Sequence, residues 1–407
     1  MTRAMDWLRR VGHSRWLDVG AALVAVLWGV RIGLLLPHRM RGNDFAHYYV
    51  ARQLLFGSPN PYTAPLPPLY AQHGFGSEIS LPHCTDPPAM LWLFAPLESL
   101  PPGAAFGVWV CLEITSLVAV LWLTRRLLAG RLSVRGWRFV CAGTLASEAL
   151  YRHFYFSQIQ LPLAALLLAA YAWQQRGKHW RACLAVTVAG LLKLFPFLLL
   201  PWFVWRSDGS MKARAAKAAT VIVVTAICIW LTGWSRWVDF GRDAMPIIAD
   251  AAKRSLGSFG VGSLAAKFGD GMRALGTVIG LALLAPGYWS CFRPRGDREA
   301  EFCLLSVAML AGGLVVWPHY FVLLIFPMAV AAVRIGTEQS LPRILLYALL
   351  VLCLNDVDTR TTPFLRGHPG LEALVNYQPL YAMLALWCLF MMYLREPVRP
   401  NTGGKGA

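Results

Sequence analysis

Apolar segments long enough to cross a lipid bilayer recur along this sequence from one end to the other, and this feature constrains the fold most. A helix needs about 20 mostly apolar residues to cross the hydrocarbon core of a membrane. Charged residues make up 14% of the 407 residues, whereas a soluble protein carries about 25%. The sequence therefore predicts an all-α polytopic membrane protein in which residues 1–407 form a single domain.

Basic residues at the ends of the apolar segments predict how the chain is oriented. Lys and Arg are enriched in short loops on the cytoplasmic side of a membrane. Arginines precede the first apolar segment, at roughly 16–36, and place the N-terminus in the cytoplasm. Residues 37–103 then form a long extracytoplasmic loop before the next span, at roughly 104–124. Short loops between the spans, where Lys and Arg set the orientation, hold much of the net charge of +17. This charge therefore does not indicate a nucleic-acid partner.

The apolar segment at roughly 182–205 does not fit a single span. Basic residues flank it on both sides, which predicts that both of its ends are cytoplasmic. Lys193 and Pro196 lie near its middle, and proline removes a helical hydrogen bond and clashes with the preceding turn. We expect two short helices that enter the membrane and return, with the turn near Lys193. One kinked span is the alternative.

With this hairpin, the other apolar segments give about ten full spans, with both termini in the cytoplasm. Residues 152–153 are the expected outer connection between the third and fourth spans. Besides the two spans already named, we expect spans at roughly 137–151, 158–174, 216–232, 274–292, 301–316, 319–333, 343–354 and 378–394.

The start of the outer loop carries a group of polar side chains. Asp44, His47 and Tyr48 have the spacing i, i+3, i+4, so a helix that begins here places them on one face. A carboxylate in this position could take the proton from an acceptor hydroxyl in a transfer reaction. Alternatively, Asn43 or Asp44 is the N-cap of this helix, since both residue types are favoured there.

Four further candidates for ligand binding lie at the ends or breaks of apolar segments. Lys193 offers a positive charge to a phosphate, because an ionisable residue within a membrane segment indicates function; alternatively, it snorkels to the interface. Gln158 begins a span from the outside and could bond sugar hydroxyls, or is a polar helix end. His319 and Tyr320 could bind phosphate or sugar, or belong to the aromatic belt.

The nine cysteines include no CxxC pair, and only Cys84 lies clearly in a loop. Neither a disulfide framework nor a zinc site is therefore expected. Glu113 lies within a span and should be paired or face a cavity, but the sequence names no partner for it.

Several short blocks of residues occur in order along the chain: Asp44-Phe45, Tyr48-Tyr49, Gly57, Pro61-Tyr62, Pro87-Pro88, Pro96-Leu97, Ser157-Gln158, Lys193, Pro196, His319-Tyr320 and Pro327. In this order the blocks resemble glycosyltransferase family 87, also called domain of unknown function 2029. Two blocks depart from the family pattern: Thr85-Asp86-Pro87-Pro88 stands where a tyrosine usually precedes the proline, and Ser157-Gln158 where Gly-Gln is usual.

This resemblance implies a GT-C-like bundle that transfers a sugar from a polyprenyl phosphate to a glycolipid or glycan acceptor outside the cell membrane. Similar members use polyprenyl-phosphate mannose. The resemblance implies Asp44 as the general base of an inverting hexosyltransferase, with Asp86 as the rival carboxylate. No metal cofactor is expected, because the polyprenyl phosphate leaves as a charged monoester. The expected substrate-binding residues are His47, Tyr48, Gln158, Lys193, His319 and Tyr320.

The alternative function is a multi-span transporter or a flippase of a lipid-linked sugar. A transporter would carry ionisable groups on discontinuous helices near the middle of the membrane, and Lys193 and Glu113 offer a little of that pattern. No internal repeat stands out, and a transporter does not explain the long outer loop. In either case the expected partners include membrane lipids and no nucleic acid.

Overall fold

The computed structural model describes residues 15–39, 44–57, 60–76, 82–206, 210–255, 257–292, 296–338, 340–355 and 368–395. Within these ranges every regular element is helical, as the apolar segments predicted. Four helical stretches are long and apolar enough to cross a membrane, or up to six if each of two bent pairs is one span. The chain is therefore a helical membrane protein.

The α-helices are short and numerous because proline, glycine and polar residues interrupt many of the apolar segments. Short 3₁₀ helices are η1 (Ala95–Leu97), η2 (Phe195–Leu199) and η4 (Pro318–Leu324), and η3 (Phe240–Ala244) is a π-helical turn. The α-helices are α2 (Arg15–Arg39), α3 (Asp44–Gln53), α4 (Pro67–Gln72), α5 (Pro88–Leu93), α6 (Pro102–Leu127), α7 (Val134–Leu145), α8 (Glu148–Phe156), α9 (Gln160–Gln175), α10 (His179–Leu192), α11 (Leu200–Trp205), α12 (Met211–Thr232), α13 (Trp234–Asp239), α14 (Met245–Arg254), α15 (Val261–Ala266), α16 (Asp270–Ala282), α17 (Ala285–Ser290), α18 (Arg298–Ala311), α19 (Ile325–Glu338), α20 (Leu341–Asn355), α21 (Pro369–Asn376) and α22 (Gln378–Arg395).

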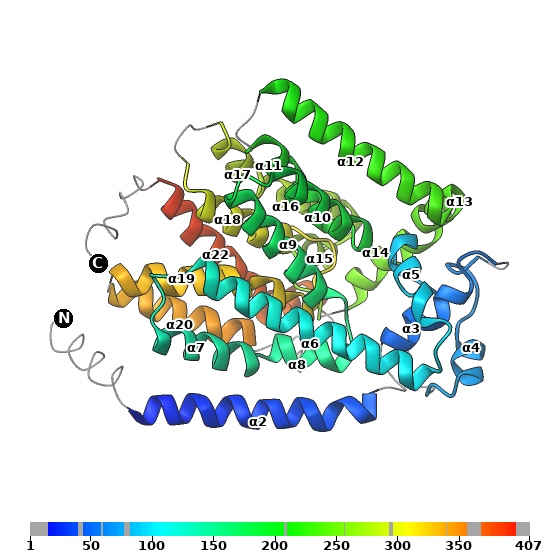
Figure 1. The fold of residues 1–407 in the computed structure, drawn as a ribbon, viewed down its shortest axis with the longest axis horizontal. Coiled ribbons are helices and arrows are strands. Elements are labelled where there is room, and N and C mark those ends of the chain that lie inside the picture. Colours follow the sequence, from blue (N-terminus) through cyan, green and yellow to red (C-terminus); the bar gives the residue numbers. More distant parts are fainter. Residues whose placement is uncertain are drawn as a thin grey trace.

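The helices form a bundle whose centre is α18, in which Ala300–Ala311 are all buried. A helix that is apolar on all sides is stable only in such a position or in lipid. By contrast, α2 and α12 lie on opposite sides of the bundle in Figure 1 and expose most of their apolar side chains. These two helices are therefore the ones most exposed to lipid.

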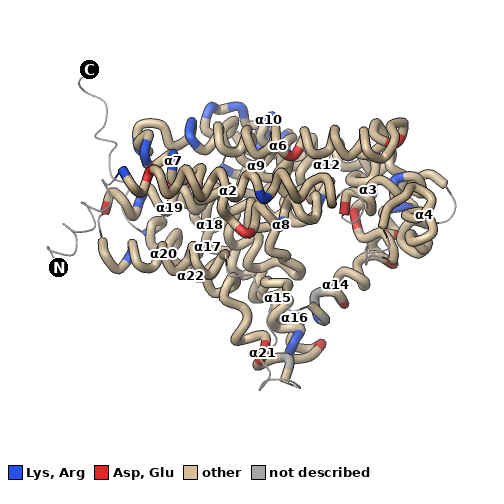
Figure 2. The backbone as a smooth tube through the Cα atoms, turned by 90° about the horizontal axis from the view of Figure 1, so that it is seen from below, with Lys and Arg blue, Asp and Glu red and all other residues tan. Residues whose placement is uncertain are grey.

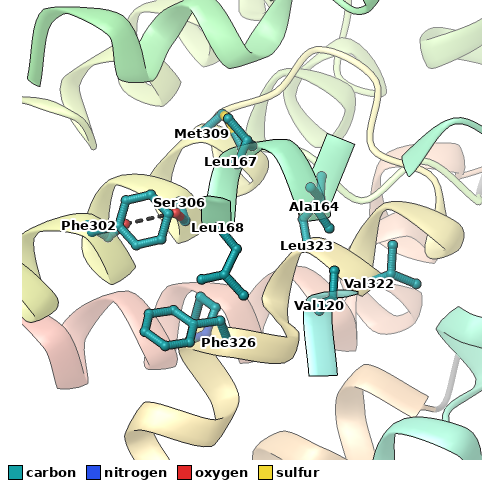
Figure 3. A pocket seen from close by; sticks show the side chains of 11 residues that line it. Val120, Ala164, Leu167, Leu168, Phe302, Ser306, Met309, Val322, Leu323 and Phe326 are labelled. Atoms are coloured by element: carbon teal, nitrogen blue, oxygen red, sulfur yellow. Dashed lines mark hydrogen bonds between the residues drawn. The ribbon is translucent and has the colours of Figure 1, made fainter. Parts of the chain in front are cut away.

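The interior of the bundle is tightly packed. Between α9, α18 and η4, the side chains of Leu168, Phe302 and Phe326 surround a cavity of only about 20 Å³ (Figure 3). A space of this size holds about one water molecule. This part of the bundle is a packed core and offers no room for a substrate.

Ion pairs show that several basic loops lie at one end of the molecule. Arg131 and Arg334 both contact Glu299, and Arg206 contacts Glu301, two residues further along α18. At the same end, α2 begins and α6 and α22 end, whereas α3 and α4 lie at the opposite end (Figure 1). Many of the Lys and Arg positions also lie toward that end in Figure 2. The bundle thus has a basic end and an outer-loop end.

The segment predicted as a hairpin breaks at Lys193, between α10 and η2. Its two arms pack together so closely that a Cβ atom on Gly190 would lie 2.6 Å from the ring of Phe197. Both ends of the segment lie at the basic end. The contact of Arg206 with Glu301 places its C-terminal end there. Its N-terminal end follows α9, and the ring of Tyr171, near the end of α9, stacks on that of Phe302. The predicted break and return of the chain are therefore present.

The prediction that residues 152–153 connect two spans is wrong. These residues lie within α8, and the chain turns at Ser157, which adopts a left-handed conformation with φ 49°. Helices α8 and α9 meet there at an angle of 119°. Ser147 explains the separate start of α8, because its hydroxyl accepts a hydrogen bond from the Leu150 backbone nitrogen and caps the helix.

The outer loop folds into a cap of short helices, α3, α4, α5 and η1, against one end of α6. Phe45, Tyr48, Phe94 and Trp109 are buried together there, with ring centroids 4.8–6.1 Å apart for each contacting pair. The segment that follows α12 forms α13, η3 and α14 and reaches the cap through Arg236, which donates a hydrogen bond of 2.8 Å to the Leu55 carbonyl oxygen. Aromatic packing thus fixes the cap that carries Asp44.

Candidate functional site

Helix α3 begins at Asp44 and turns the predicted face toward the bundle. The side-chain amide of Gln158 donates a hydrogen bond to Oδ2 of Asp44, and its Oε1 atom accepts one of 3.0 Å from the hydroxyl of Tyr48. Gln158 stands at the sharp turn between α8 and α9, so the left-handed backbone at Ser157 aims it at α3. Asp44 is half-buried and Tyr48 is buried. The proposed capping by Asn43 falls outside the described residues.

A second row of polar side chains lies beside the first. Nζ of Lys193 donates a hydrogen bond of 2.5 Å to Oδ1 of Asp86, and Nε2 of His47 lies 3.4 Å from Oδ2 of the same carboxylate. The side chains of His47, Asp86 and Lys193 are only 0%, 3% and 16% exposed. The buried carboxylate of Asp86 is therefore held between two basic groups: Lys193 at the break in the hairpin, and His47 on the inner face of α3.

The contacts of Asp86 and His47 decide their charges. Burial by itself raises the pKa of Asp86, but the positive charge of Lys193 and the contact with His47 outweigh it and hold the pKa below its usual range. Burial by itself lowers the pKa of His47, but the contact with Asp86 reverses this and holds its pKa well above the usual value. These contacts therefore favour an ionised Asp86 and a protonated His47.

The two rows form one cluster. Lys193 interacts electrostatically with Asp86, Tyr320 and Asp44, and Tyr48 interacts with both carboxylates. Tyr320 comes from η4, where its ring lies 5.5 Å from that of Phe195. The cluster therefore draws on α3, the 82–87 segment, the α8–α9 turn, the hairpin break and η4.

The remaining predicted residue, His319, is buried behind Tyr320, and their ring centroids are 4.9 Å apart. Its ring nitrogens make no hydrogen bond among the described residues. Glu113, for which the sequence named no partner, lies 3.2 Å from Nε2 of His153, and both side chains are fully buried. The structure thus brings together every predicted site residue, although Lys193 is paired with Asp86 and not with Asp44.

The model of glycosyltransferase family 87 matches residues 85–318, more than half of the chain. This protein belongs to glycosyltransferase family 87. No curated protein and no solved structure matches the chain.

Family 87 membership makes this chain a membrane glycosyltransferase. The matched segment contains Asp86, Gln158 and Lys193, and it ends immediately before His319. Asp44 precedes it, and the hydrogen bond from Gln158 connects this carboxylate to the matched part of the fold. The cluster is therefore the candidate active site of this family 87 member.

Sequence reasoning treated Asp86 only as a rival base and missed its pairing with Lys193. The sequence feature that could have drawn attention to Asp86 is its position directly before two prolines. Prolines keep the backbone extended, and Pro87 has φ −58° and ψ 150°. The structure also places Cys84 beside His47 and Asp86, and these three are described residues that could hold a metal ion. Cys84 and Asp86 lie two residues apart, but His47 lies 37 residues before Cys84, so spacing along the chain did not indicate the whole group.

Proposed function

We propose that this family 87 member transfers a sugar, mannose by resemblance, from a polyprenyl phosphate to a glycolipid or glycan acceptor. The transfer takes place with inversion at the outer face of the cell membrane, and Asp44 is the general base. The observation that carries this proposal is the half-buried Asp44 carboxylate, which Gln158 holds where it interacts electrostatically with the largely buried cation Lys193. A proton acceptor next to a positive charge is what such a transfer requires.

The residues of the cluster divide into three roles in this proposal. Asp44 takes the proton from the acceptor hydroxyl as the sugar carbon is attacked. Lys193 and Tyr320 stabilise the negative charge on the departing polyprenyl phosphate. Tyr48 and Gln158 hold Asp44 in position and, with His47 and His319, complete the sugar and phosphate pocket. The leaving group carries its own charge as a phosphate monoester, so the transfer itself needs no metal ion.

The assignment of the base to Asp44 rests on the difference between the two carboxylates. Asp86 is fully buried, contacts two basic groups and has a pKa below its usual range, which makes it a weak proton acceptor. Asp44 is more exposed and is held by a neutral amide. Asp86 accordingly positions Lys193 and is not the base.

The two ends of the bundle support an extracytoplasmic site. Arg131, Arg206 and Arg334 lie at the basic end, and basic loops favour the cytoplasm. The cap with Asp44 lies at the opposite end (Figure 1). In this orientation the N-terminus is cytoplasmic, and the segments proposed as spans amount to about ten, with the broken segment at Lys193 as a hairpin.

An apolar cavity supports a lipid-linked donor. It has a volume of about 140 Å³ and lies between α7, α8, η4, α19 and α20. Phe321, which directly follows Tyr320, is part of its wall together with Phe139, Met328 and Tyr347. A cavity lined by aromatic and aliphatic side chains suits an isoprenoid segment.

Exchange of each carboxylate for its amide tests the proposal. Purified protein in lipid vesicles is supplied with radiolabelled polyprenyl phosphate sugars and extracted acceptors. Asp44→Asn should lower the transfer rate about 10²–10⁴-fold, the usual cost of losing a general base, while donor binding survives. The exposed Asp270 provides the matched control, since Asp270→Asn should leave the rate unchanged.

The outcomes separate the candidate functions. Normal transfer by Asp44→Asn together with loss in Asp86→Asn would move the base to Asp86. Normal transfer by both variants would contradict a transferase that uses this cluster and would favour the transporter or flippase alternative.

A further inference from the structure

Three side chains with metal-binding atoms meet beneath α3. One ligand atom each from His47, Cys84 and Asp86 lies within 4.8 Å of the other two. All three residues are buried, at 0%, 0% and 2% exposed. They come from two separate segments of the outer loop, α3 and residues 82–87, so an ion bound to them would connect the two segments.

The orientation of His47 points to a ligand. Its Nδ1 atom forms a hydrogen bond of 3.1 Å with the hydroxyl of Tyr70, and this bond fixes the plane of the ring. Its Nε2 atom faces the cluster and lies 3.4 Å from Oδ2 of Asp86, in a contact that does not form a regular hydrogen bond. A histidine that binds a metal through one ring nitrogen characteristically donates a hydrogen bond from the other. A metal ion between Nε2 and Asp86 would replace this long contact with two short bonds.

The chemistry of the three donor atoms selects the ion. Imidazole nitrogen, thiolate sulfur and carboxylate oxygen together suit Zn²⁺, whereas Ca²⁺ and Mg²⁺ prefer oxygen ligands alone. Zinc bonds of 2.0–2.3 Å in a tetrahedron separate neighbouring ligand atoms by about 3.3–3.8 Å. Small side-chain rotations from the present spacing therefore suffice. The second oxygen of Asp86 remains available to Lys193, and water can complete the tetrahedron.

A Zn²⁺ ion held by these three side chains would bury no net charge. A neutral imidazole, a thiolate and a carboxylate together balance its two positive charges, so no unpaired charge is buried.

We propose that His47, Cys84 and Asp86 bind one Zn²⁺ ion that ties α3 to residues 82–87 and fixes Asp86 beside Lys193. The role of this ion is structural. It lies behind the carboxylate that orients Lys193, and the proposed transfer does not pass through it. The site can therefore be tested without any measurement of sugar transfer.

The metal content of the full-length protein is the first test. The protein is expressed with added zinc, purified in detergent through a tag without histidines, and measured by mass spectrometry of its metals. Wild type should carry about one zinc per chain, and Cys84→Ala, Cys84→Ser and His47→Gln should each lose most of it. Cys183→Ala, at another buried cysteine, and His73→Gln, in the same loop, should retain it.

A spectroscopic test keeps the proposal falsifiable even if a variant folds poorly. Chelator-treated wild type titrated with Co²⁺ should develop a thiolate-to-metal charge-transfer band, and added Zn²⁺ should abolish it. The apparent affinity for Zn²⁺ should rise with pH, because the metal binds the thiolate and the neutral imidazole.

Two results would overturn the proposal. One is a wild type that contains no zinc and develops no charge-transfer band with Co²⁺. The other is a zinc content that Cys84→Ser and His47→Gln leave unchanged, which would mean an adventitious ion only. In either case His47 and Asp86 form a simple ion pair.

Discussion

The pairing of Asp86 with two cations predicts an unequal response to the removal of its partners. In Asp86→Asn, Lys193 loses its ion-pair partner and keeps only its electrostatic interaction with Asp44, while His47 loses the carboxylate that favours its protonated form. Breaking a buried pair in this way costs about 3–5 kcal/mol of folding free energy. In Lys193→Met, Asp86 keeps its contact with His47, so the loss is close to that of one charged hydrogen bond, about 1.5–3 kcal/mol.

The double variant measures the coupling between the two residues. With Asp86→Asn and Lys193→Met combined, only His47 is left in the group, and it can lose its proton. The combined cost should therefore be smaller than the sum of the two single costs by at least about 1 kcal/mol. As a matched control, Lys253 pairs with Asp270 at 3.0 Å on the exposed surface, where Lys253→Met should cost about 1 kcal/mol or less.

Unfolding in mixed micelles, followed by tryptophan fluorescence as the fraction of denaturing detergent increases, gives these free energies. The measurements use chelator-treated protein, so that bound metal does not contribute. Equal losses in the two single variants, or strict additivity in the double variant, would refute the view that Asp86 is held between two charges. A loss at Lys253 as large as that at Lys193 would show that burial does not govern the effect.

Three further predictions concern other parts of the molecule. The raised pKa of His47 means that its stabilising charge is complete below the unfolded value of about 6.5 and is lost as the pH rises through the folded value. Chelator-treated wild type should therefore lose thermal stability with rising pH above that point, and His47→Gln should lack this decline; parallel curves would disprove it. Gln158→Leu should lower kcat about 10- to 100-fold by freeing Asp44, with the donor KM little changed; a change in KM alone would instead make Gln158 a substrate contact. Single cysteines at Lys178 and Lys212 should both react with a label added from the cytoplasmic side, and labelling from opposite sides would exclude the hairpin.

Several features of this protein follow from local sequence. The apolar segments are long and form helices. The lysine and proline in the middle of one segment interrupt its helix at Lys193. The spacing i, i+3, i+4 placed Asp44, His47 and Tyr48 where they reach one cluster. These features depend on the composition and period of a short stretch of chain, so the sequence contains all the information needed.

Other features depend on contacts between distant parts of the chain. Lys193 was expected to serve the same site as Asp44, but its ion pair is with Asp86, 107 residues away in sequence. Nothing local indicated His153 as the partner of Glu113, or Ser157 in place of residues 152–153 as the turn.

The sequence by itself determined that the chain is helical, which end of the bundle is basic, and which face of α3 carries polar groups. The tertiary structure decided which charge pairs with which, and it brought Cys84 next to His47. The physical reason is that burial, together with the low dielectric of the interior, makes each ion pair depend on where both partners lie in space. Helical period and proline act through covalent geometry over a few residues, whereas pairing depends on how whole helices pack.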